Sequence, residues 1–61
     1  MTVSALEIVD VKHQIKGYAR TLYINYRARV MLSGRELPAW ENASPAVRRE
    51  FIRDARIAFG Y

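Results

Sequence analysis

Apolar residues recur every three or four positions from residue 5 to residue 32, which is the period of an α-helix with one buried face. Ser4 and Glu7 have the spacing of a capping box, so the helix is predicted to begin near Ala5. Ser33 and Gly34 are predicted to end it, because glycine adopts the left-handed conformation that closes many helices. The apolar face consists of Ile8, Val11, Ile15, Tyr18, Ala19, Leu22, Tyr23, Tyr26 and Val30.

This first helix leaves two questions open. Unbroken, it would be about 40 Å long at roughly 1.5 Å per residue, which is longer than a compact domain of this size needs. It therefore either breaks near Gly17, where glycine costs up to about 1 kcal/mol, or pairs with another chain. The β-branched residues Ile8, Val9 and Val11 also keep a short strand open as an alternative for residues 5–16.

A connector with the chain's one tryptophan is predicted for residues 35–43. Pro38 keeps Leu37 out of helical geometry, so Leu37 and Trp40 are expected to point inward as anchors of the loop.

A second helix is predicted to begin after Ser44, whose hydroxyl suits the N-cap, with Pro45 at the first helical position. Gly60 is placed to end it. Its apolar arc is Val47, Phe51, Ile52, Ala55, Ala58 and Phe59, and a stripe of Arg49, Arg53 and Arg56 lies on another side. The sequence therefore predicts an all-α fold: residues 1–61 form one small domain of a long and a shorter helix, expected to dimerise through the long apolar face.

The composition supports a folded chain that needs help to be stable. A chain of 61 residues buries only about 60% of its unfolded surface. It has no cysteine for a disulfide or a structural metal site, yet 51% of its residues are apolar. Stability is therefore expected to come from tight helix packing or from self-association. No apolar run approaches the roughly 18 residues of a membrane span and no secretory signal is visible, so we expect a cytoplasmic protein.

The sequence lacks the residues of an active site. Its three serines all have capping or helix-ending explanations. His13 shares an arc with Glu7 and Asp10, which suggests an acid–base pair or a weak metal site, but that arc lies opposite the apolar face and is expected to be solvated. We therefore predict a non-enzymatic protein with no cofactor and no metal.

Basic residues are the main candidates for ligand binding, because ten Lys and Arg against six acids give a net charge of +4. One set lines an edge of the first helix, where it suits either phosphate contacts or the cover of the apolar face by its aliphatic stems. It comprises Lys12, Lys16, Arg20 and Arg27. The arginine stripe of the second helix has the same two interpretations, with Glu50 and Asp54 nearby to weaken its field.

Arg48 falls inside the apolar arc of the second helix and so needs a partner. The choices are Glu41, the face of Trp40, an anionic ligand, or solvent at the edge of the arc. The tyrosine row of the first helix is similarly ambiguous between core, subunit interface and binding platform.

Part of the chain, from residue 18 to residue 61, resembles known small proteins. The pattern is Ala19-x-x-Leu22-Tyr23-x-x-Tyr26, then Leu37-Pro38-x-Trp40-Glu41-x-x-Ser44 with Arg49. It is similar to small helical proteins encoded by phages and prophages, and to the helical repeat named after the ryanodine receptor, although that repeat carries a longer loop. The resemblance implies a noncatalytic module that binds a nucleotide-like ligand, without assigning any contact residue.

Two functions follow as expectations. The first is an accessory or regulatory protein that binds another protein, or a second copy of itself, through a tyrosine-rich helix face. That face is Ile15, Tyr18, Leu22, Tyr23, Tyr26 and Val30. The alternative is a binder of nucleic acid or a nucleotide-like ligand through basic edges and the Trp40 loop. Its candidates are Lys16, Arg20, Arg27, Trp40, Arg48 and Arg49.

Overall fold

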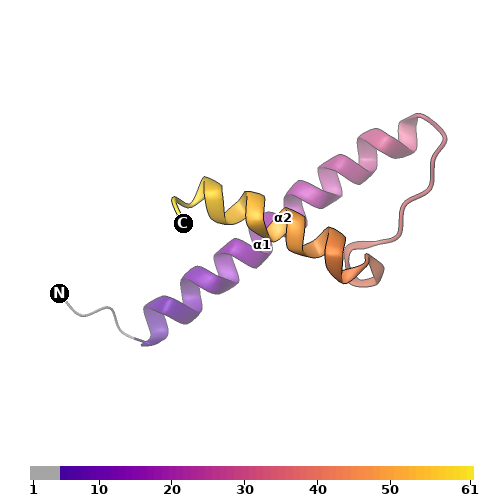
Figure 1. Cartoon of the computed structure of the whole chain (residues 1–61). Coiled ribbons are helices and arrows are strands. Elements are labelled where there is room, and N and C mark those ends of the chain that lie inside the picture. Colours follow the sequence, from indigo (N-terminus) through magenta and orange to yellow (C-terminus); the bar gives the residue numbers. More distant parts are fainter. Residues whose placement is uncertain (1–4) are drawn as a thin grey trace.

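The computed structural model describes residues 5–61, with side chains from residue 11 onward. Within that range it contains helix α1 (Ala5–Leu32), a short 3₁₀ turn (Trp40–Asn42) and helix α2 (Pro45–Ala58), without a strand (Figure 1). The predicted all-α fold is confirmed, and the strand considered for residues 5–16 is wrong because this segment is helical. Ser4 of the predicted capping box lies outside the described residues, as do the side chains of Glu7 and Ile8.

Of the two alternatives for the long helix, the break near Gly17 does not occur, because α1 continues through it as one 28-residue helix. Ile15 and Ala19, on either side of the glycine, are both buried. Their packing holds the helix together against a propensity cost of only about 1 kcal/mol. The hydroxyl of Thr21 also donates a 3.1 Å hydrogen bond to the Gly17 carbonyl.

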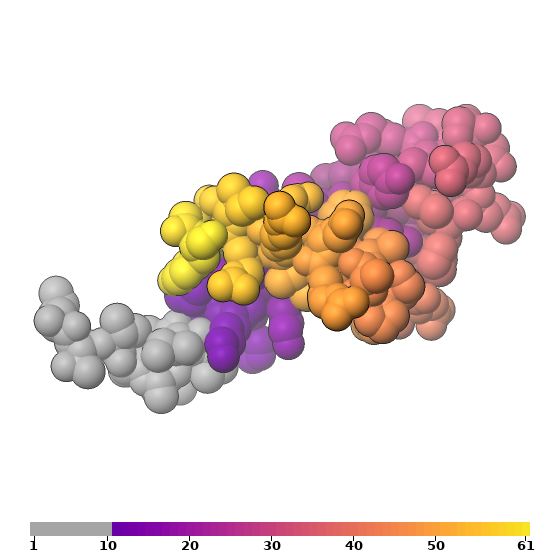
Figure 2. All heavy atoms as spheres, in the orientation of Figure 1, coloured from indigo at the N-terminus to yellow at the C-terminus, as the bar shows by residue number. Residues whose placement is uncertain are grey.

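Helix α2 crosses the middle of α1, and both ends of α1 extend beyond the crossing (Figure 1). The two helices meet at Ala19 and Ala55, both fully buried, whose small side chains let the backbones approach closely. Ile15 completes the buried centre, and further apolar side chains pack around it: Val11, Leu22, Trp40, Phe51 and Ile52. The space-filling view shows α2 lying over α1 in an elongated molecule of 50 × 19 × 15 Å (Figure 2).

The connector returns along α1 and is tied to it by two side chains. The Tyr23 hydroxyl donates to the Pro38 carbonyl, and the Arg27 Nε donates to the Leu37 carbonyl at 2.8 Å. Leu37 and Trp40 are half-buried, as expected of loop anchors.

The ends of the helices follow the sequence prediction. Gly34, with φ of +89°, closes α1, and Gly60, with φ of +85°, follows α2. Ser44 caps α2 by accepting a 3.2 Å hydrogen bond from the Val47 amide, and Pro45 occupies the first turn. These local signals fix where α1 ends and where α2 begins and ends.

Candidate functional site

The tyrosine-rich face of α1 is the side on which α2 packs. Tyr23 is only 2% exposed, and its ring lies 5.6 Å from that of Trp40 and 5.3 Å from that of Phe51. Ile15 is buried, and Leu22 and Val30 are half-buried.

Tyr18 and Tyr26 are more exposed, at 41% and 39%, but their rings also have partners within the chain. Tyr18 meets Phe59 edge-on at 5.9 Å, and Tyr26 lies 5.6 Å from Phe51. Much of the surface predicted to meet a partner is therefore engaged by α2.

Two of the predicted phosphate contacts already have partners in the chain. Arg20 lies 3.4 Å from the Glu41 carboxylate, and this is the only ion pair among side chains 11–61. Arg27 is half-buried against the connector through its bond to Leu37. Glu41 therefore pairs with Arg20 and not with Arg48.

The remaining predicted cations gather around Ile52, where three adjoining grooves share this side chain. One groove, of about 350 Å³, lies between Lys16 of α1 and Trp40, Pro45, Arg48, Arg49 and Ile52. We call the surface around these grooves the Ile52 face. Its basic members are Lys12, Lys16, Arg48, Arg49, Arg53 and Arg56.

The charged side chains that are described on the Ile52 face are all basic. This face holds six of the ten Lys and Arg residues of the chain, and no Asp or Glu among the described side chains lines its grooves. All its basic members are exposed except Arg48, which is half-buried. Glu50 and Asp54 lie along the other edge of α2, in a groove with Tyr26 and Val47, so they line none of the grooves of the Ile52 face.

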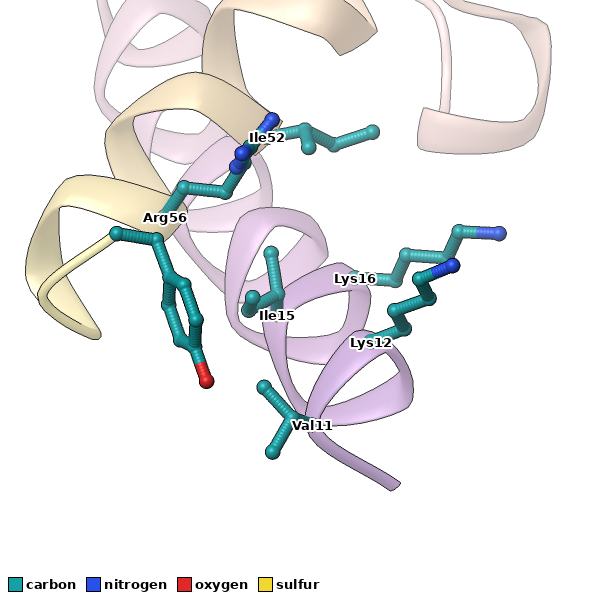
Figure 3. A pocket seen from close by; sticks show the side chains of 7 residues that line it. Val11, Lys12, Ile15, Lys16, Ile52 and Arg56 are labelled. Carbon is teal, nitrogen blue, oxygen red and sulfur yellow. The ribbon is translucent and has the colours of Figure 1, made fainter. Parts of the chain in front are cut away.

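A close view of this face shows how the two helices share it. Lys12 and Lys16 extend side by side from α1, while Ile52 and Arg56 come from α2 across the groove (Figure 3). The floor between them is apolar and includes Val11 and Ile15. A phosphate chain crossing this face would meet cations from both helices.

Sequence reasoning found both basic stripes but not that they adjoin. Lys12 lies in the basic set of α1, and Arg53 and Arg56 lie in the arginine stripe of α2. Neither helix alone carries a sequence signal that the crossing brings these two sets together.

The described residues contain few features of a metal site or of a membrane-spanning helix. His13 is exposed, and side chains 11–61 contain no group of three or more His, Cys, Asp or Glu arranged to hold a metal ion. Over the same part of the chain, neither helix has the length and apolar character needed to cross a bilayer.

Three comparisons with known proteins returned nothing: no protein-family model, no curated protein and no solved structure matches the chain. The resemblance to phage proteins and to the ryanodine-receptor repeat therefore stays a prediction.

Proposed function

We propose that this protein is a noncatalytic nucleic-acid binder that holds the phosphate backbone on its Ile52 face. The observation that carries the proposal is the gathering of six cations from two helices around grooves whose described lining contains no acid. Each Lys or Arg that neutralises a phosphate releases condensed counterions, so such a face favours a polyanion over an isolated anion. Trp40, half-buried at one end of the face, adds an aromatic edge.

The tyrosine-rich face supports the alternative, binding to another protein, less well. Its central ring, Tyr23, is buried against Trp40 and Phe51 and bonded to Pro38, so a partner would have to displace α2 to reach it. The Ile52 face needs no such rearrangement, because nearly all of its cations are already exposed.

Charge reversal tests the proposal. The double variant Lys16→Glu, Arg49→Glu removes two cations that line the Trp40 groove. We expect its affinity for a fluorescent oligothymidylate to fall roughly tenfold or more at low salt, because two phosphate contacts become repulsive. We also expect the slope of log affinity against log salt to become shallower by about 1.4, at about 0.7 per lost contact on a single strand. Fluorescence anisotropy measures both.

The matched control is Arg29→Glu, Arg35→Glu, which changes the net charge equally. Both arginines are exposed and neither lines a groove of the Ile52 face. This control should lose much less affinity than the groove variant. Equal losses for the two variants would show that net charge alone, and not this face, attracts the oligonucleotide, and that result would overturn the proposal.

Self-association is a second candidate, and two large apolar side chains of α1 that remain exposed favour it. Ile24 is 45% exposed and Met31 is 42% exposed. Their burial against a second copy would remove apolar surface from water.

The surface that suits a second copy lies on α1, where its C-terminal part extends beyond α2 (Figure 1). Thr21, Ile24, Ala28 and Met31 follow one another at intervals of three and four residues, and all four are exposed. Packed antiparallel about a two-fold axis, Ile24 of one copy faces Ala28 of the partner subunit, and Met31 faces Thr21 of the partner subunit. Large side chains then meet small ones along a self-complementary seam.

Sedimentation velocity tests this seam. Ile24→Glu places a charge in the proposed interface and should convert a dimer into a monomer. Ile57→Glu is the control, because Ile57 is an exposed isoleucine of α2, 62% accessible, outside the proposed interface. This variant should leave the dimer intact. A wild-type chain that sediments as a monomer at high concentration would exclude the candidate.

A further inference from the structure

Tyr61 is held in place by the turn that ends α2. Its amide donates a 2.8 Å hydrogen bond to the Arg56 carbonyl, and the Gly60 amide donates a 3.0 Å bond to the Ile57 carbonyl. With Gly60 at φ of +85°, these two bonds form a Schellman motif, which turns the chain back on the helix it has just left. The residue after the glycine is therefore fixed beside the Ile52 face.

The ring of Tyr61 lines two of the grooves of that face. In one groove, of about 330 Å³, it joins the apolar floor of Val11 and Ile15. In the next it lies with Arg53 and Ile57. Figure 3 shows the cations at the rim of the first groove, with Lys12 and Lys16 on one side and Arg56 opposite. The groove therefore combines an apolar floor with a positively charged rim.

Tyr61 differs from the other aromatic residues of the chain. Each of the six others lies in a ring pair: Tyr18 with Phe59, Tyr23 with Trp40 and Phe51, and Tyr26 with Phe51. Among the described residues Tyr61 is the one aromatic side chain in no such pair, and it is 66% exposed. About two thirds of this residue is therefore accessible to a partner from outside the chain.

We propose that Tyr61 stacks on an unpaired nucleobase while Lys12, Lys16 and Arg56 hold the adjoining phosphates, so that the protein selects single-stranded over double-stranded nucleic acid. Bases within a duplex are stacked on one another and offer no free face to a side chain, whereas an aromatic ring beside a basic groove is the usual platform for single strands. The inference rests on the proposed function and adds the strandedness of the ligand to it.

The experiment compares the full chain with Tyr61→Ala and Tyr61→Phe, by anisotropy, on three probes. The probes are an oligothymidylate, an abasic oligonucleotide of the same length, and a blunt-ended duplex of two separate strands. We expect Tyr61→Ala to lose about fivefold to a hundredfold in affinity for the oligothymidylate, because it removes one stacking partner. Tyr61→Phe keeps the ring and should stay near wild type. Binding to the abasic strand should be the same for all three proteins.

Each other outcome has a meaning. If wild type binds the abasic strand or the duplex as tightly as the oligothymidylate, base stacking is overturned while the phosphate-binding function stands. Equal loss for Tyr61→Ala and Tyr61→Phe would assign the effect to the hydroxyl and also overturn the proposal. If wild type binds none of the probes at low salt but binds vesicles of phosphatidylglycerol and phosphatidylcholine, the polyanion is a lipid surface, and the proposed function falls together with this inference.

Discussion

The side chain of Tyr23 makes two kinds of contact in this small fold, one through its ring and one through its hydroxyl. Its ring fills the space between Trp40 and Phe51, and its hydroxyl holds the connector at Pro38. The apolar period of the sequence placed Tyr23 on the correct side of the helix. It did not indicate which element would cover it, because a helical period specifies the buried face and says nothing of the neighbour that buries it.

Two substitutions separate the ring from the hydroxyl. Tyr23→Phe keeps the ring and should lower the free energy of unfolding by about 1 kcal/mol, the net worth of one hydrogen bond. Tyr23→Ala leaves a cavity and should cost about 3–5 kcal/mol. A core of this size rarely supplies more than about 3–5 kcal/mol, so the alanine variant should be largely unfolded. Urea denaturation followed by circular dichroism measures both, and a Tyr23→Ala midpoint equal to wild type would contradict this packing.

At the scale of the elements, the ends of the helices could be predicted where a residue of the sequence acts on the backbone beside it. Ser44, Pro45 and the glycines at 34 and 60 act on the backbone next to them, and each does what its chemistry predicts. The outcome at Gly17 was not predictable in this way, because the packing of Ile15 and Ala19 against α2 outweighs the weak propensity of one glycine.

Alanine should therefore change the stability of the chain in opposite directions at Gly17, within α1, and at Gly34, just after its end. Apart from Gly17 itself, its two chain neighbours and the adjacent helix backbone, no atom lies within 4 Å of the position that a Cβ would take. Gly17→Ala should therefore raise the free energy of unfolding by up to about 1 kcal/mol. Gly34→Ala should lower it by about 1 kcal/mol, because φ of +89° strains any residue with a Cβ. Thermal unfolding at a fixed protein concentration measures the pair. Stabilisation by Gly34→Ala would contradict the left-handed end of α1.

At the scale of the whole molecule, the crossing of α1 and α2 makes a surface that neither helix has alone. Lys12 and Lys16 lie on one helix and Arg49 and Arg56 on the other, and Ile52 stands between them. The sequence predicted the two basic stripes, because each is periodic within its own helix. Their meeting depends on the position and angle of the crossing at Ala19 and Ala55, which helical periodicity does not encode.

The central claim is that nucleic acid binds on the Ile52 face, and the most direct test is a titration of the isotopically labelled protein with oligothymidylate, followed by amide NMR. The account predicts that the shifts concentrate at residues 12–16, 48–56 and 61. The amides of residues 24–31, none of which lines a groove of the Ile52 face, should move least. Shifts concentrated instead at Tyr26 and its neighbours in the acidic groove, or an absence of shifts at low salt, would contradict it.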